Sequence, residues 1–180
     1  IVLNTNTERT NVITGRALRT LWGANDIVDT LHIHEVIQKQ VNGDTYTSKD
    51  SNIQNGTVFK KTEESVTFGI SPLSFYQVNH DMAEKLYSKA ADYAECEGKT
   101  VLDLYCGAGT IGLSMAKSAK KIIGVEIIPE AIEDAKHNAQ INGINNARFI
   151  CADATAAAKQ LEKEGVTCDV VIVDPPRKGC

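Results

Sequence analysis

The stretch Val101-Leu-Asp-Leu-Tyr-Cys-Gly-Ala-Gly-Thr-Ile-Gly112 decides the fold of this chain. An apolar run leads into glycines at positions 107, 109 and 112, and Leu113-Ser-Met-Ala-Lys117 continues at helical spacing. This order predicts a strand, a tight turn and the start of a helix. Glycines let the backbone approach a ligand closely, and the N–H groups at a helix N-terminus are free to receive it. The stretch therefore predicts a ligand-binding loop.

The spacing of the glycines does not name the ligand. Gly107-x-Gly109-x-x-Gly112 fits a dinucleotide fingerprint, and Glu126 lies where such a fold places its ribose-binding acid. Asp103, however, precedes the first glycine by four residues, and an acid there would repel a pyrophosphate. The same acid can meet the amino group of a methionine moiety, as in binders of S-adenosylmethionine (SAM). Asp103 therefore favours SAM over a nicotinamide dinucleotide.

From residue 80 onward, strands and helices alternate. We expect strands at 100–105, 121–126, 147–152 and 168–173, with helices at 110–119, from Pro129 to Gly143, and at 154–164. This alternation predicts an α/β fold with a doubly wound, mostly parallel sheet and right-handed crossovers. Ligands bind beyond the carboxyl ends of such strands, where the sequence places Tyr105, Glu126, Asp153 and Asp174.

Two helices carry clear boundary signals. Asn79 or Asp81 can cap a helix that ends near Gly98 and carries Met82, Leu86, Ala90 and Tyr93 on one face. Pro129 at a first-turn position starts another helix, which Gly143 ends. Its inward residues are expected to be Ala131, Ile132, Ala135 and Ala139.

Residues 1–79 differ in composition from the rest of the chain and predict a small mixed β subdomain, followed by the ligand-binding region at 80–180. The short alternating runs that predict its strands are Ile1-Val-Leu3, Asn11-Val-Ile-Thr14, residues 27–33 and residues 65–70. Residues 39–61 are polar and contain Asn-Gly at 42–43 and 55–56, which predicts a hairpin or a long excursion.

Composition indicates an intracellular protein. No apolar run approaches the roughly 20 residues needed to span a bilayer, and no signal peptide opens the chain. The five cysteines contain no Cys-x-x-Cys pair, which favours reduced thiols in a cytoplasm and no metal site. The net charge of −4 does not favour RNA phosphate, so an RNA substrate would need basic surface outside this chain.

Four blocks in order give the chain a family resemblance. They are Ile70-Ser-Pro-Leu-Ser-Phe-Tyr-Gln-Val-Asn79, Asp103 to Gly112, Gly124-Val-Glu126 and Asp174-Pro-Pro-Arg-Lys-Gly179. With these blocks the chain resembles the SAM-dependent RNA uracil-5-methyltransferases, which act on transfer RNA (tRNA) or ribosomal RNA (rRNA). Compared with that family, residues 39–61 look like an insertion. The resemblance also implies that the chain is a fragment with an incomplete sheet, about three strands short.

The resemblance and the residues together predict the cofactor site. The resemblance alone implies that Gln77 binds SAM, whereas the Gly107 loop is expected to bind it because its glycines admit a ligand close to the backbone. Glu126 can hold the ribose hydroxyls or cap the next turn, and Asp153 can bind the adenine amino group or cap a helix. Tyr105 can pack against the methionine portion or be structural, and Thr110 can bind the ligand or act as a cap. Asp174 is expected nearest the chemistry. The predicted set is Gln77, Asp103, Tyr105, Gly107, Thr110, Glu126, Asp153 and Asp174.

No catalytic nucleophile is assigned. By resemblance, a cysteine thiolate in a Ser-Cys-Asn-Pro segment adds to C6 of uracil, and a later glutamate removes the C5 proton, but the chain contains neither motif. Cys106 is expected to pack in the glycine loop, and Cys180 lies in a different context. Asp174-Pro-Pro also suits methylation of amino groups, although Arg177 stands where those enzymes usually carry an aromatic residue. A non-catalytic SAM- or RNA-binding module is the remaining alternative.

Overall fold

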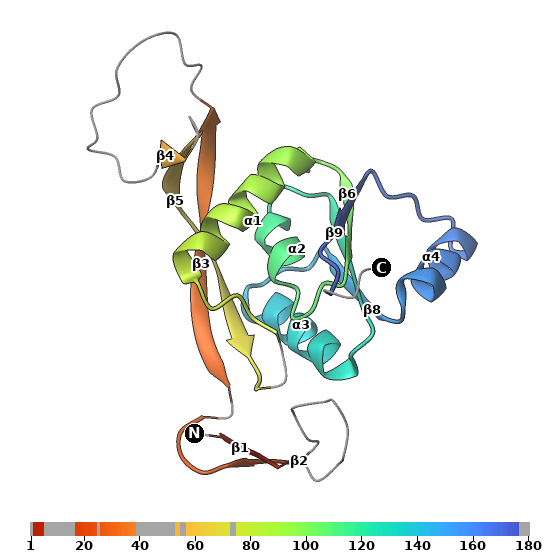
Figure 1. Ribbon diagram of the computed structural model, residues 1–180. Helices are drawn as coiled ribbons and strands as arrows, with labels where there is room; N and C mark the ends of the chain where they lie inside the picture. Colours follow the sequence, from red (N-terminus) through yellow and green to blue (C-terminus); the bar gives the residue numbers. More distant parts are fainter. Residues whose placement is uncertain are drawn as a thin grey trace.

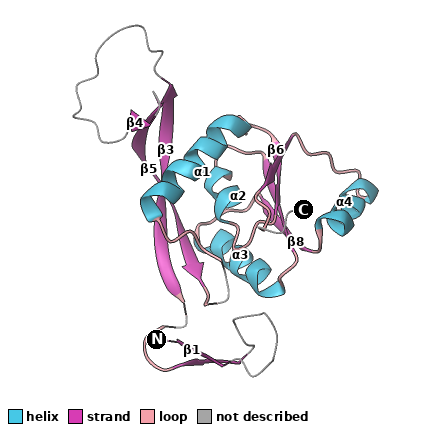
Figure 2. Ribbon diagram, viewed as in Figure 1, coloured by secondary structure: helices cyan, strands magenta, loops and turns pink. Residues whose placement is uncertain are grey.

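Strands and helices are stacked in alternating layers. The computed structural model describes residues 2–5, 17–24, 26–38, 53–54, 57–72 and 75–176. An antiparallel sheet, a layer of three helices, a parallel sheet and a last helix follow one another from left to right in Figure 1. Figure 2 shows the same arrangement coloured by secondary structure, with a separate pair of short strands near the N-terminus.

The parallel sheet confirms the predicted α/β fold. Its strands are β6 (Thr100–Leu104), β7 (Lys121–Glu126), β8 (Ala147–Cys151) and β9 (Val170–Val173), in the order β8-β7-β6-β9. All three pairings are parallel. The helices are α1 (His80–Ala94), α2 (Thr110–Met115), α3 (Pro129–Ile141) and α4 (Ala154–Lys163). Among the described residues, α2 ends four residues earlier than predicted and β9 begins two residues later.

Helices cover both faces of this sheet. Neighbouring residues of a strand point to opposite faces, and residues on both faces are buried under helices. Ile122 of β7 is fully buried in a cluster with Met115 and with alanines of α1. Ile123, the next residue, is fully buried in a second cluster with Ala157 and Leu161 of α4. The sheet is therefore doubly wound, as the sequence predicted.

The N-terminal region forms two antiparallel sheets, whereas the sequence predicted one mixed sheet. The first pairs β1 (Val2–Thr5) with β2 (Ala17–Thr20), and the second has the order β3-β5-β4, with β3 (Ile27–Gln38), β4 (Ile53–Gln54) and β5 (Thr57–Ile70). The predicted hairpin around 55–56 is confirmed by the antiparallel pairing of β4 with β5, and residues 57–61 of the expected insertion belong to β5. The predicted strand at 11–14 and the Asn-Gly at 42–43 lie outside the described residues.

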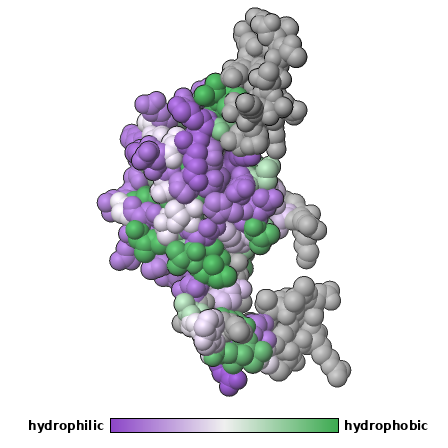
Figure 3. Space-filling model, turned by 90° about the vertical axis from the view of Figure 1, so that its left-hand side faces the viewer, coloured by the Kyte–Doolittle hydropathy of each residue, from purple (hydrophilic) through white to green (hydrophobic). Residues whose placement is uncertain are grey.

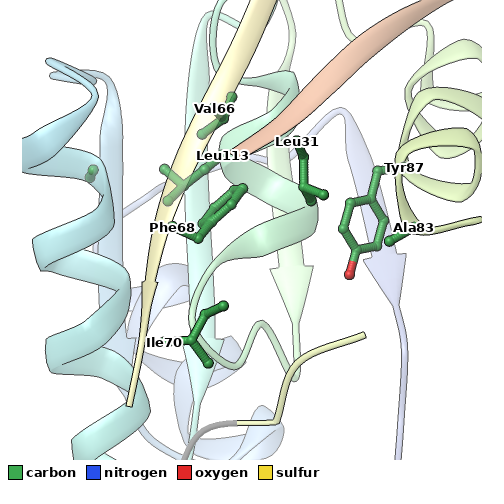
Figure 4. Close-up of a cluster of buried hydrophobic side chains, with 8 residues drawn as sticks. Leu31, Val66, Phe68, Ile70, Ala83, Tyr87 and Leu113 are labelled. Atoms are coloured by element: carbon green, nitrogen blue, oxygen red, sulfur yellow. The ribbon is translucent and has the colours of Figure 1, made fainter. Parts of the chain in front are cut away.

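The long β3–β5 hairpin shares a core with the helices of the second region. Leu31 of β3 and Phe68 of β5 are buried against Tyr87 of α1 and Leu113 of α2 (Figure 4). Burial of large apolar side chains such as these contributes about 1.5–3 kcal/mol each. The hairpin therefore helps to hold α1 and α2 in place, and the division between 1–79 and 80–180 stays a prediction.

The predicted face of α1 was wrong for three of its four residues, since only Ala90 packs against a buried cluster. Met82, Leu86 and Tyr93 are 42%, 54% and 75% exposed, whereas Glu84 and Ser88 are buried together with Ala83 and Tyr87. The predicted cap is confirmed, since the Asn79 side chain accepts a hydrogen bond from the N–H of Met82.

The reason for the polar face lies in the strand that α1 covers. β3 is the edge of its sheet, so alternate N–H groups along it need partners outside the sheet. The N–H of His32 donates to Glu84 Oε1 at 2.7 Å, and the N–H of His34 donates to Ser88 Oγ at 2.9 Å. Burial, the largest single influence, would raise the pKa of Glu84, but the hydrogen bonds from His32 and the charges of Lys61 and His80 together lower it below its usual value. Polar residues therefore belong on the buried face of α1.

The surface on the hairpin side is largely hydrophilic, with hydrophobic residues gathered in its lower part (Figure 3). Two exposed hydrophobic residues lie at the start of β3, where Ile27 is 71% exposed and Val28 is 69% exposed. None of the helices that the structure describes is long and apolar enough to cross a membrane.

Candidate cofactor-binding site

Two adjoining cavities lie at the carboxyl ends of the parallel strands, and Tyr105 lines both. The first is bounded by the segment after β5, by α1, by the loop after β6 and by the residue that follows β9. The predicted residues that line it are Gln77, Tyr105, Gly107, Thr110 and Asp174. The second lies between the ends of β7 and β8 and is lined by Tyr105, Glu126 and Asp153. Of the predicted residues, only Asp103 lines neither cavity.

The loop after β6 has an unusual backbone. Tyr105, Gly107 and Gly109 have φ angles of 64°, 53° and 81°, in the left-handed region that costs a residue with a side chain about 1–2 kcal/mol. The loop is closed by hydrogen bonds from the N–H of Cys106 to Val125 O and from the N–H of Gly109 to Cys106 O. A left-handed non-glycine residue such as Tyr105 is often found where the backbone is shaped for function.

Glu126 joins this loop to the start of α3. Its Oε2 accepts a hydrogen bond from the N–H of Gly107 at 3.2 Å. Its Oε1 accepts from the N–H groups of Ile127 and Ile128 at 2.8 and 3.0 Å. A carboxylate has about four acceptor positions, so three backbone donors leave little capacity unused. The capping alternative is therefore present in the structure, and the contact with the ribose hydroxyls stays a prediction.

Asp153 and Thr110 also have local partners. Asp153 is the N-cap of α4, where its Oδ1 accepts a hydrogen bond from the N–H of Ala156 at 2.8 Å. Thr110 is the first residue of α2, and its hydroxyl donates to the hydroxyl of Tyr87 at 3.3 Å. Both residues line a cavity as well. Asp153 can therefore serve as a cap and contact a ligand, whereas the cap predicted at Thr110 is wrong, because Gly109 is the N-cap of α2.

Asp103 lies beneath the loop. It is 1% exposed, and its Oδ2 accepts a hydrogen bond from the N–H of Gly112 at 3.0 Å. Its Oδ1 is buried without a hydrogen-bond partner among the described residues. Burial raises the pKa of Asp103 to about 7, and the negative charges of Asp174 and Glu126 act in the same direction. Asp103 therefore supports the turn directly, and its contact with the methionine amino group stays a prediction.

Tyr87 was missed by the sequence reasoning. It is 4% exposed and lines the first cavity, and its hydroxyl accepts a hydrogen bond from the hydroxyl of Thr110. Burial raises the pKa of its phenol, so the ring stays neutral at physiological pH. Its position four residues after Ala83 gives the true buried face of α1, a signal that the more apolar Met82 and Leu86 obscured.

The loop cysteine has the packing role that the sequence predicted. Cys106 is buried, and burial raises the pKa of its thiol far above the ordinary value, so it stays protonated. Within the described part of the chain, no group of histidine, cysteine and acidic residues could hold a metal ion. Cys180 and Arg177 lie outside the described residues.

A larger cavity, of about 320 Å³, lies at the other end of the sheet. It is lined by residues of the hairpin, by the end of α2, and by Asn145 and Asn146 just before β8. Ligands of open parallel sheets bind at the carboxyl ends, so the two cavities around Tyr105 are the candidate cofactor site.

Comparison with known proteins shows what the chain is similar to. The family model of a methyltransferase domain matches residues 95–176. A relative from Oceanobacillus iheyensis, named as an uncharacterized RNA methyltransferase, is 41% identical over 181 residues, which cover 100% of this chain and 32% of the relative. A relative of the same description from Staphylococcus aureus is 44% identical over 178 residues, covering 98% of this chain and 32% of the relative. The chain is therefore similar to proteins named as RNA methyltransferases along nearly its whole length.

A solved structure gives the same assignment for the fold. The tRNA (uracil-54, C5)-methyltransferase of Pyrococcus abyssi, in complex with S-adenosyl-L-homocysteine, is similar with a TM-score of 0.63 and 27% identity. The similarity covers 98% of this chain and 34% of that one, and the chain spans about a third of the length of its curated relatives. The methyltransferase-domain match and this neighbour imply that SAM is the cofactor. The positive charge of SAM suits the acidic residues around the two cavities.

Proposed function

We propose that the protein transfers the methyl group of SAM to C5 of a uridine in tRNA or rRNA. The relatives support an RNA substrate, and the structural neighbour acts on a uracil of tRNA. The block Ser74-Phe-Tyr-Gln-Val-Asn79 supports the choice of uracil C5, because the resemblance to the uracil-5 family rests on it.

One observation carries the proposal: Phe75, Gln77 and Asp174 line the same cavity as the glycine loop. Phe75 is 75% exposed, so its ring is available to stack on a flat base. Gln77 offers both a donor and an acceptor, which a uracil edge or the cofactor requires. The base and the methyl group would therefore meet at the cavity that these residues bound.

The residues of this chain supply binding and orientation. When bound, SAM supplies an electrophilic methyl group on a positively charged sulfur. Tyr105, Glu126 and Asp153 would hold the adenosine part in the second cavity, and the Gly107 loop would face the methionine part in the first. No nucleophile is assigned among the described residues, because burial keeps the Cys106 thiol protonated.

The test measures which hydrogen is replaced. Methylation at C5 releases the C5 hydrogen, so RNA labelled with tritium at C5 of uridine should release tritium in the presence of the whole protein and SAM. Nucleoside mass analysis of the same RNA should show 5-methyluridine. The variant C106S serves as a control and should retain this activity, since Cys106 is assigned to packing.

Two other outcomes would replace the proposal. N6-methyladenosine or a methylated cytosine amino group, formed without release of tritium, would favour amino methylation through Asp174-Pro-Pro. The absence of any modified nucleoside, with both tRNA and rRNA offered, would favour a binding module. We also propose a cytoplasmic location, because Cys96, Cys106, Cys151 and Cys168 are free thiols.

A further inference from the structure

Asn138 of α3 is a polar side chain enclosed completely by the protein, with 0% exposure. Its Oδ1 accepts a hydrogen bond from the N–H of Gly69 at 2.8 Å, and its Nδ2 donates to the carbonyl oxygen of Ala108 at 3.1 Å. One amide group thus contacts two segments that lie far apart in the sequence. Figure 1 shows α3 between β5 and the parallel sheet, where such a bridge is possible.

One of these segments lines the first cavity, and the other leads along the chain to residues that line it. Gly69 lies at the end of β5, and the chain continues from there to Phe75 and Gln77, which line the cavity. Ala108 lies between Gly107 and Gly109 in the loop that also lines this cavity. Asn138 therefore ties the loop to the end of the strand from which the chain continues to Phe75 and Gln77.

An amide meets both requirements at this position. The carbonyl of Ala108 needs a donor and the N–H of Gly69 needs an acceptor, which also fixes the orientation of the Asn138 amide. Aspartate would place an acceptor against the Ala108 carbonyl, and an apolar residue would leave both backbone groups without partners. Buried polar groups without partners are costly, so the loop would shift to find another partner.

We propose that Asn138 is a positioning residue for SAM, which holds the glycine loop and the segment that carries Gln77 at the separation that the cofactor requires. The inference rests on the cofactor site assigned in the proposed function. Asn138 itself contacts neither cavity, so it acts through Ala108 and Gly69.

Asn142 provides a matched control on the same helix. It lies one turn later, and its side chain binds the N–H and carbonyl of Thr67 in β5 at 2.8 and 2.6 Å. It also donates to the backbone carbonyl of Asn138, but among the described residues it forms no hydrogen bond with the glycine loop. Asn142 therefore shares the structural role of Asn138 toward β5 and lacks the bridge to the loop.

The test compares N138A with N142A by calorimetric titration with S-adenosylhomocysteine, well below the melting temperature of each variant. Both variants should have a lower melting temperature than the wild type. N138A should bind the ligand roughly five- to tenfold more weakly, the effect of losing one hydrogen bond, while the affinity of N142A should be unchanged. Equal affinities of N138A and N142A would overturn the positioning role. A wild-type protein that binds no ligand would instead overturn the cofactor site itself.

A measurement on the wild type covers the case in which N138A does not fold. In a nuclear magnetic resonance titration with S-adenosylhomocysteine, the side-chain amide signals of Asn138 should shift because Ala108 lines the ligand cavity. The corresponding signals of Asn142 should stay in place. Ligand binding without a shift at Asn138, or with equal shifts at both residues, would refute the inference.

Discussion

Replacing Asp103 with asparagine should change how the stability of the protein depends on pH. Burial raises the pKa of Asp103 from 3.8 to about 7 in the folded state. Because the folded pKa lies above the unfolded one, the protonated form stabilises the fold at low pH. That contribution is complete below pH 3.8 and is lost as the pH rises through about 7. The wild type should therefore lose stability across this range, and D103N should not.

The size of the effect follows from the shift. The rise in the pKa of Asp103 from 3.8 to about 7 corresponds to a contribution on the order of 4 kcal/mol to the free energy of unfolding. This is an upper value, because water can reach the carboxylate once it is charged. Asparagine keeps an oxygen for the N–H of Gly112 and places a neutral NH2 group where Oδ1 has no partner. D103N should therefore be more stable than the wild type by a few kcal/mol above pH 7 and similar to it near pH 4.

Urea denaturation followed by circular dichroism between pH 4 and 8 measures this difference. The variant E130Q, which removes an exposed acid in the first turn of α3, controls for the change in net charge. Parallel pH profiles for the wild type and D103N would refute the reasoning. Calorimetry with SAM then separates the two roles of Asp103. A loss of affinity in D103N supports contact with the methionine amino group, and an unchanged affinity leaves only the support of the turn at Gly112.

Two further predictions concern the loop. E126Q should lower the free energy of unfolding by about 1–2 kcal/mol and weaken binding of S-adenosylhomocysteine, because an amide NH2 would face the N–H of Gly107. Thermal denaturation and calorimetry test this against E130Q, and an unchanged melting temperature would contradict it. G109A should cost about 1–3 kcal/mol more than G107A in urea denaturation, because a Cβ at Gly109 would come within 3.1 Å of Leu113 Cδ1 whereas one at Gly107 meets nothing within 4 Å. Equal losses would show that the crowding at Gly109 is relieved by movement of the loop.

The parallel sheet was predictable because its signals are local. The apolar run before Tyr105 and the glycines after it specify a strand and a turn, and Pro129 and Gly143 mark the two ends of α3. The buried alanines of α3 follow directly from helical periodicity, and the predicted inward set is confirmed by their burial. Local chemistry of this kind needs no knowledge of the rest of the fold.

The face of α1 was not predictable in the same way. Periodicity assigns the largest apolar side chains to the core, yet α1 covers the edge of the antiparallel sheet, where the N–H groups of His32 and His34 need acceptors. Glu84 and Ser88 supply those acceptors, so polar residues are buried. Likewise, nothing in the sequence around Asn138 indicates that its amide joins Gly69 to Ala108. Such roles arise from contacts between segments 30 to 70 residues apart.

The charges around the two cavities explain why the glycine loop suits SAM better than a dinucleotide. Asp103, Glu126 and Asp174 lie close enough that the last two raise the pKa of the first. A pyrophosphate would add negative charge to this field, whereas SAM brings a positive sulfur and a positive amino group. The N–H of Gly107 in the loop donates a hydrogen bond to the Glu126 carboxylate, so this N–H is not free to bind a phosphate. The acids around the glycine loop therefore favour a positively charged cofactor over a pyrophosphate.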